Sequence, residues 1–167
     1  SLPHVLTPED ILLGKPNIGK TVLVYDCDGH VMGSGVAEKL ARDGKRVILV
    51  TPLPRISPYT DQTLDSPQYR RVLRDAGIEM LASATLKKIQ ETHCIIKSRG
   101  AADREIEADT VVLVTTRVSN DSLYREIKAR SAEFPDLGIT GVFAIGDCVA
   151  PRMIGDDKQD PSAVRLD

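Results

Sequence analysis

The chain has 167 residues, a net charge of −2 and six aromatic residues, four Tyr and two Phe. Its 41% hydrophobic and 28% charged residues exclude an intrinsically disordered chain. The near-neutral charge and the lack of Trp argue against nucleic-acid binding, and the length is below the roughly 250 residues of a (β/α)₈ barrel.

The cysteines are too few and too scattered for a metal centre. Cys27, Cys94 and Cys148 form no CxxC pair, so the chain offers neither a zinc ribbon nor the ligands of an iron–sulfur cluster. Free cysteines of this kind are typical of a reduced, cytoplasmic protein. We expect no signal peptide and no membrane span, because the first residues lack a basic start and every apolar run is short.

The first third of the sequence predicts a βαβ unit. A short helix is expected over 8–13, where Thr7 caps the amino end and Pro8 occupies the first turn. Apolar runs over 21–25 and 46–51 are typical of buried parallel strands, and the segment 33–43 between them has helical periodicity.

The later elements predict a Rossmann-like three-layer α/β domain, with a central parallel sheet and a small antiparallel meander. They follow an irregular, proline-rich segment. In chain order they are a helix over 66–76, a short strand over 78–81, three antiparallel strands over 86–90, 93–98 and 104–108, a buried strand over 110–115, a polar helix over 121–131 and a last strand over 141–145.

Residues 14–21 match the phosphate-loop pattern GxxxxGK[ST] letter for letter. That loop binds phosphate only when a strand precedes it and a helix follows, because the helix amino end then faces the ligand. Here a helix precedes the motif and a strand follows. We therefore interpret the match as a turn with a solvated Lys20.

The segment Asp26-Cys27-Asp28-Gly29 follows a buried strand and resembles the first motif of haloacid-dehalogenase-type phosphatases. In that family the first Asp is the nucleophile and the second is the general acid/base. Other residues of such a site appear in the matching order, namely Thr115 or Thr116, Lys128 and Asp147. A magnesium-dependent phosphatase, with Mg²⁺ between Asp26 and Asp147, is thus one alternative.

The same loop is a degenerate form of the dinucleotide fingerprint GxGxxG. Aligning Gly33 with the last glycine puts His30 and Asp28 at the other two positions. Asp26 and Asp28 then place negative charge where a pyrophosphate would lie, which disfavours tight NAD binding. Gly29 and Gly33 stay candidate cofactor-binding residues, and a competent NAD(P)H-binding reductase domain stays a second alternative.

Five segments together resemble the trimethylamine dehydrogenase group, which includes dimethylamine and histamine dehydrogenases, within the NADH:flavin oxidoreductase/2,4-dienoyl-CoA reductase family. The longest is "TVLVYDCDGHVMGSGVAEKLARDGKRVILVTP" over 21–52. The other four are "HVLTPED" over 4–10, "DTVVLVTTR" over 109–117, "LYREIKAR" over 123–130 and "GVFAIGDCVAPR" over 141–152.

The resemblance implies a three-part protein of which this chain is one piece. An N-terminal barrel would carry FMN and a 4Fe-4S cluster, and a second domain would hold ADP or FAD. Residues 1–140 would be a degenerate NAD-type domain inserted into the second domain, 141–154 the return strand of that second domain and 155–167 an irregular tail. The chain alone would hold no catalytic residue and no tightly bound cofactor.

The resemblance also implies the remaining site residues and the partners. Gly146, Asp147 and Cys148 match a strand-end motif that reaches the dinucleotide in related flavoproteins. Expected partners are the rest of the same polypeptide and an electron-transferring flavoprotein, and the full-length protein is expected to be a homo-oligomer. A role as a pure interaction module, bracing a dimer or docking the electron acceptor, stays open.

Overall fold

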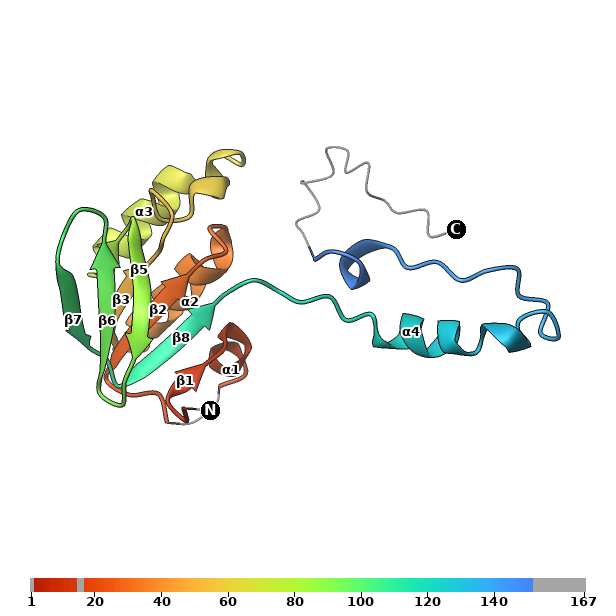
Figure 1. The fold of residues 1–167 in the computed structure, drawn as a ribbon. Coiled ribbons are helices and arrows are strands. Elements are labelled where there is room, and N and C mark those ends of the chain that lie inside the picture. Colours follow the sequence, from red (N-terminus) through yellow and green to blue (C-terminus); the bar gives the residue numbers. More distant parts are fainter. Residues whose placement is uncertain (1, 15–16, 152–167) are drawn as a thin grey trace. The chain divides into compact units, whose positions relative to one another are not determined.

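The structure, a computed structural model, describes residues 2–14 and 17–151 (Figure 1). Contacts between residues divide the chain into two units, Ser1–Thr116 and Arg117–Asp167, which we call the first and the second unit. The tail predicted over 155–167, and the last residues of the segment 141–154, lie outside the described residues.

A five-stranded parallel sheet forms the centre of the first unit. Its strands lie in the order β1-β8-β2-β3-β4, and every neighbouring pair is parallel. Four of them match predicted strands, whereas the two-residue β1 was not predicted. The strands are β1 (Val5–Leu6), β2 (Thr21–Asp26), β3 (Arg46–Val50), β4 (Glu79–Leu81) and β8 (Thr110–Val114).

Helices cover one face of this sheet. They are α1 (Pro8–Leu12), α2 (Val31–Arg42) and α3 (Ser66–Asp75), with a short 3₁₀ turn, η1, over Pro58–Asp61. The predicted cap of α1 is confirmed: the Thr7 hydroxyl accepts from the Asp10 N–H, and the Asp10 carboxylate accepts from the Thr7 N–H. Helix α2 begins two residues before the predicted start.

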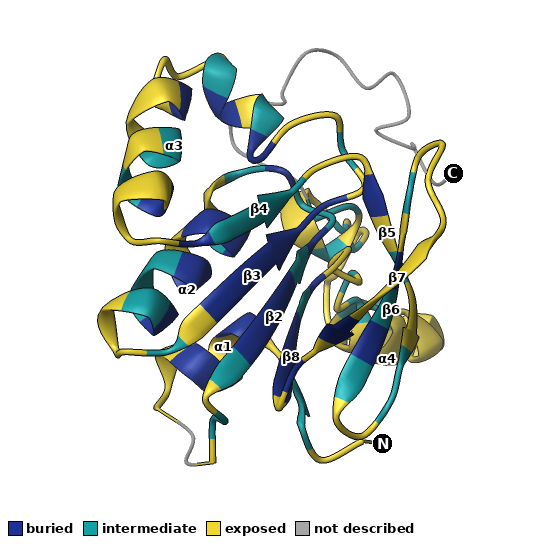
Figure 2. Cartoon of the chain, turned by 90° about the vertical axis from the view of Figure 1, so that its left-hand side faces the viewer, coloured by how far each residue is buried: buried dark blue, intermediate teal, exposed yellow. Residues whose placement is uncertain are grey.

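A three-stranded antiparallel meander covers the other face of the sheet (Figure 2). It consists of β5 (Ala84–Ile89), β6 (His93–Ser98) and β7 (Asp103–Glu107). Cys94 and Ile96 of β6 are fully buried against the sheet, in one cluster with Ile48 of β3. The predicted three-layer fold, with helices, parallel sheet and meander, is therefore confirmed.

The central strands are buried on both faces. In β2, Val22 and Val24 belong to the cluster on the helix side, whereas Leu23 belongs to the cluster on the meander side. All three side chains are completely buried. This explains why the sequence of β2 is a continuous apolar run and not an alternation of apolar and polar residues.

The second unit contains α4 (Ser122–Ala129) and two short 3₁₀ turns, η2 (Ser131–Glu133) and η3 (Gly146–Cys148). None of the residues of α4 is buried. The boundary between the units at Thr116 lies before α4, and the assignment of residues 1–140 to one inserted domain stays a prediction. The assignment of 141–154 to a separate domain stays a prediction.

The prediction of a strand over 141–145 is wrong, because this chain forms no strand there. That segment is extended without strand pairing, and Phe143 and Ile145 are 84% and 82% exposed. A β-strand needs a hydrogen-bonded neighbour, and the described part of the second unit contains no other strand.

None of the helices in residues 2–14 and 17–151 combines the length and the apolar content that crossing a lipid bilayer requires.

Candidate functional site

The first candidate site is the loop that joins β2 to α2. Asp26 is the last residue of β2 and pairs with Val114 of β8, so it lies at the carboxyl edge of the parallel sheet. The N–H of Cys27 extends the pairing by donating to the Val114 carbonyl over 2.8 Å. Open α/β sheets bind their ligands at this edge, where the loop meets the amino end of a helix.

The Asp26 carboxyl fills this loop from within. Its Oδ1 accepts the N–H groups of Asp28 and Gly29 over 3.0 and 3.1 Å, and the side chain is completely buried. In a dinucleotide-binding domain, backbone N–H groups of this loop face the pyrophosphate. Here an internal carboxyl takes up two of these donors.

Gly33, in the first turn of α2, makes room for that carboxyl. A Cβ atom at Gly33 would lie 2.4 Å from the Cγ of Asp26, a distance that non-bonded carbons do not tolerate. A glycine is thus required at this position because the Asp26 side chain approaches its Cα closely. Contact between Gly33 and a cofactor stays a prediction.

The environment of Asp26 favours its protonated form. Burial raises the pKa of Asp26, and the N–H groups of Gly29 and Asp28 counter this only in part. Its second oxygen, Oδ2, is buried and makes no hydrogen bond to the described residues. A buried carboxylate oxygen without a donor is costly, which is the physical reason for the raised pKa.

Gly29 is also packed against the protein's own side chains. Its φ of +72° belongs to the left-handed region, and a Cβ there would lie 2.5 Å from Cδ1 of Leu53 and 2.9 Å from the ring of Tyr59. Tyr59 donates its N–H to the Gly29 carbonyl over 3.1 Å, and its ring centroid lies 4.9 Å from that of His30. The segment after β3 therefore closes over the loop. Contact between Gly29 and a cofactor stays a prediction.

A buried hydrogen bond holds that segment in place. The hydroxyl groups of Ser34, in α2, and Ser57 are hydrogen-bonded to each other, and both residues are buried. Ser57 adopts a left-handed conformation with a φ of +46°, and its carbonyl accepts the Thr60 hydroxyl over 2.7 Å. The turn that carries Tyr59 is thus fixed against α2.

The geometry does not support Asp26 as a phosphatase nucleophile. A nucleophile must reach the phosphorus atom, yet Asp26 is 0% exposed and its Oδ1 is held by two N–H groups. Asp28 points back to its own loop, where its carboxylate accepts the His30 N–H over 3.3 Å. Residues 2–14 and 17–151 contain no group of three side chains placed to hold a metal ion.

In the segment that matches the phosphate-loop pattern, backbone N–H groups likewise donate to side chains of the same chain. Gly19 donates its N–H to the Thr110 hydroxyl over 2.9 Å, and the N–H groups of Lys20 and Thr21 donate to Asp109 over 2.9 and 2.8 Å. These amides are therefore occupied by the chain itself, and Thr21 begins a strand. The two residues at 15–16 lie outside the described residues.

The second candidate site lies within the second unit, around η3. A cavity of about 350 Å³ is lined there by Arg117, Asn120, Asp147 and Cys148, with Val118 and Pro151. Ser119 donates its hydroxyl to the Val149 carbonyl over 2.8 Å, and the Cys148 thiol donates to the Ile145 carbonyl over 2.9 Å. The first bond holds the segment after β8 beside the predicted Gly146-Asp147-Cys148 motif, and the second lies within the turn that carries the motif.

Arg117 and Asn120 are residues of this cavity that the sequence analysis missed. Arg117 closes the segment "DTVVLVTTR", so its position directly after a strand was the available signal. The cavity combines one cation, one amide and the exposed carboxyl of Asp147. Such a set suits a polar ligand that carries both negative charge and hydroxyl groups.

Comparison with known proteins identifies the family. A family model described as the OYE-like second alpha/beta domain matches residues 6–105. The chain belongs to this family. Dimethylamine dehydrogenase from Hyphomicrobium sp. (strain x) is 36% identical to it, in an alignment that covers 93% of this chain and 24% of the relative.

Two solved structures of similar proteins extend the comparison. Histamine dehydrogenase from Rhizobium sp. 4-9 is 34% identical with a TM-score of 0.84, and the match covers 89% of this chain and 24% of that one. The 6-hydroxypseudooxynicotine amine oxidase from Pseudomonas geniculata N1 is 38% identical with a TM-score of 0.81, covering 91% and 22%. The chain therefore spans about a quarter of the length of these relatives.

A pair of glycine substitutions in α2 tests the fit of Asp26. Gly33→Ala should destabilise the chain by about 1–3 kcal/mol, because its Cβ would collide with Asp26. Gly35→Ala, in the same helix but with open space around its Cβ, should stabilise by about 0.5–1 kcal/mol. Urea unfolding measures both, and shifts in the same direction would contradict the packing described above.

The pH dependence of stability tests the burial of Asp26. Since its pKa is raised on folding, its contribution is fully present below the ordinary carboxyl pKa, about 3.9, and is lost as the pH rises through the folded-state value. Asp26→Asn cannot ionise, so its stability should fall less between pH 4 and 7 than that of the parent chain. Urea unfolding across that range measures the effect, with Asp136→Asn, at an exposed position, as the control. Equal pH slopes would disprove the assignment.

Proposed function

We propose that the chain is an accessory domain of a cytoplasmic amine dehydrogenase-like oxidoreductase that uses FMN and a 4Fe-4S cluster. The observation that carries this is the similarity to amine-oxidising enzymes across nearly all of the chain, at 34–38% identity, although the chain spans only about a quarter of each. The catalytic barrel would lie in the remainder of the same polypeptide.

The described residues do not fit an iron–sulfur cluster. Cys94 is buried in the meander core, where burial raises the pKa of its thiol to about 11, and cluster ligands must be thiolates. Cys27 and Cys148 belong to different units. We therefore assign the FMN and cluster ligands to the rest of the protein, and we expect this chain by itself to have no catalytic activity.

The first unit has a Rossmann-like fold, but we infer that it does not bind a nicotinamide cofactor. Binding a pyrophosphate at the β2–α2 loop would require Asp26 to give up the N–H groups of Asp28 and Gly29. It would also require Leu53 and Tyr59 to move away from Gly29. These costs disfavour nicotinamide binding and support a structural role for the domain. An electron-transferring flavoprotein would then be the electron acceptor of the full-length protein.

The cavity at η3 fits a nucleotide held between this chain and the rest of the protein. We assign ADP or FAD of the neighbouring domain to it. The guanidinium of Arg117 would pair with a phosphate oxygen, the Asp147 carboxyl would accept a ribose or ribityl hydroxyl, and Gly146 and Cys148 would hold the turn. The residues of this chain would thus hold the nucleotide and take no part in bond making.

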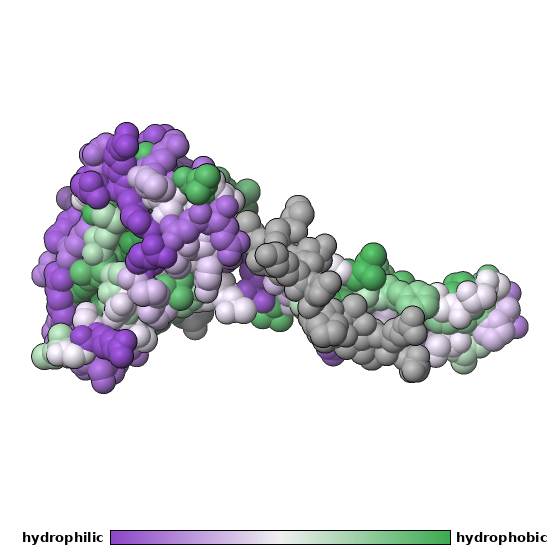
Figure 3. All heavy atoms as spheres, turned by 90° about the horizontal axis from the view of Figure 1, so that it is seen from above, coloured by the Kyte–Doolittle hydropathy of each residue, from purple (hydrophilic) through white to green (hydrophobic). Residues whose placement is uncertain are grey.

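Exposed apolar side chains in the second unit support its packing against further protein. Figure 3 shows several hydrophobic residues, in green, on the visible surface of this unit. Leu123, Leu137, Phe143 and Ile145 are between 64% and 84% exposed. Large apolar side chains exposed in this number support an interface, here with the remainder of a homo-oligomeric protein.

Activity assays test the accessory role. The purified chain should neither oxidise amines nor oxidise NADH, and calorimetry should detect no saturable NADH binding up to about 1 mM, because Asp26 and Tyr59 fill the loop. The full-length protein, with its barrel, should oxidise an amine. Micromolar NADH binding by the chain would instead establish a competent nicotinamide domain.

A substitution in the full-length protein tests the nucleotide assignment. Asp147→Asn should reduce the ADP or FAD that co-purifies by at least about tenfold, whereas FMN and iron content stay unchanged. Nucleotide released on denaturation is measured by chromatography. Asp136→Asn, at another exposed position in the same unit, is the control. Full nucleotide content in the Asp147 variant would refute the contact.

A further inference from the structure

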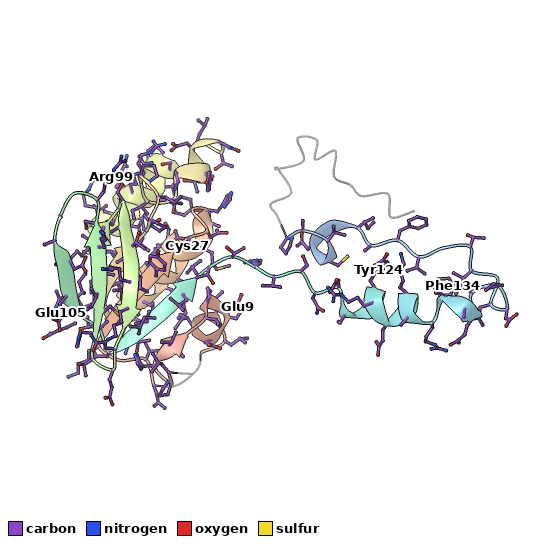
Figure 4. All side chains as sticks on the ribbon, in the orientation of Figure 1. Glu9, Cys27, Arg99, Glu105, Tyr124 and Phe134 are labelled. Atoms are coloured by element: carbon purple, nitrogen blue, oxygen red, sulfur yellow. The ribbon has the colours of Figure 1, made fainter. Side chains whose placement is uncertain are left out.

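A second polar cavity lies in the first unit, and no residue of the β2–α2 loop is among those that line it. It measures about 500 Å³, and its lining includes Ser83, Thr85, Lys97 and Arg99, with Pro52 and Pro54 opposite them. It is formed at the open end of the β5–β6 hairpin, where the segment after β3 passes the meander. Figure 4 labels Arg99 at this end of the hairpin.

Two of these four side chains belong to paired strands, and the other two lie directly beside the strand ends. Thr85 and Lys97 are direct cross-strand partners, and the Arg99 N–H donates to the Ser83 carbonyl over 3.3 Å. Ala84 lies between Ser83 and Thr85 and is fully buried against the sheet. Since side chains alternate along a strand, the next residue of β5, Thr85, points outward, and Ser83 directly before the strand is also exposed. The hairpin thus presents two hydroxyl groups and two cations together.

Backbone hydrogen bonds join the hairpin to the segment after β3, which forms the other wall of the cavity. The N–H of Ser83 donates to the Leu53 carbonyl over 2.8 Å, and that of Ala84 donates to the Thr51 carbonyl over 2.9 Å. Ser83 itself is held in the left-handed region, with a φ of +52°, which costs free energy in a residue other than glycine. The cavity is therefore built by fixed backbone on both sides.

The two cations of this cavity have no acidic partner. Among the described residues, neither Lys97 nor Arg99 is within ion-pair distance of a carboxylate. Nearby basic residues are neutralised, since Lys87 pairs with Asp103 over 2.7 Å and Arg104 pairs with Glu79 over 2.9 Å. No acidic side chain lines the cavity. The cavity is therefore a local positive site in a chain whose net charge is −2.

We propose that this cavity binds the phosphate group of a small molecule. A phosphate offers several acceptor oxygens, which match the guanidinium of Arg99, the ammonium of Lys97 and the hydroxyls of Ser83 and Thr85. The volume is within the range of small-molecule sites. A hollow lined by two cations and hydroxyl groups favours a compact oxyanion, whereas an acidic protein surface would be bound by a flat array of cations.

The test is an NMR titration of the 167-residue chain at constant ionic strength. The probes are inorganic phosphate, ADP and glucose 6-phosphate, which distinguish a free anion from a nucleotide or a sugar phosphate. We expect saturable shifts of the amide signals of Ser83, Thr85, Lys97 and Arg99, with the tightest probe identifying the source. The Lys97→Gln/Arg99→Gln double variant should bind at least about tenfold more weakly.

A matched control removes the same charge elsewhere. The Arg46→Gln/Lys88→Gln double variant loses two exposed cations outside the cavity and should bind phosphate like the parent chain. Equal weakening in both double variants, or no saturable shift at 20 mM probe, would overturn the proposal. A hexaglutamate peptide that shifts these signals when the phosphates do not would also overturn it, and would identify an acidic protein as the partner.

Discussion

The first unit depends on a parallel sheet whose central strands are buried on both faces. Val22 and Val24 need the helices on one side and Leu23 needs the meander on the other, so no layer can be removed without exposing apolar surface. Because the strands are parallel, β2, β3 and β8 all end at one edge. This requirement brings Asp26, the segment after β3 and the end of β8 together, although they are distant in the sequence.

The protein's own carboxyls occupy backbone donors at both ends of β2, Asp26 at the carboxyl end and Asp109 beside the amino end. Asp26 accepts the amides of Asp28 and Gly29, and Asp109 does the same for Lys20 and Thr21. In each case an internal carboxyl satisfies backbone donors that a phosphate would satisfy in a nucleotide-binding loop. The Rossmann-like fold is thus present while internal carboxyls occupy these donors, and cofactor contact of Gly29 and Gly33 stays a prediction.

The two units differ in how their apolar residues are covered. The first unit buries its apolar strands in two clusters, whereas Phe143 and Ile145 of the second unit are largely exposed. A segment that is apolar and lacks a strand neighbour is suited to join a sheet supplied by another part of the protein. The partial coverage of every reported relative agrees with such an arrangement.

The sequence by itself determined the three-layer fold, because continuous apolar runs, a helical period and a capped start such as Thr7-Pro8 are local signals. It also indicated that Asp26 and Asp28 oppose a pyrophosphate. Only the tertiary structure decided that Asp26 is buried against Gly33 and that Tyr59 covers Gly29, since both contacts require the packed sheet edge. The failure at 141–145 has the same origin: a strand forms only where another strand accepts its hydrogen bonds, and no local pattern reveals whether that strand belongs to the same unit.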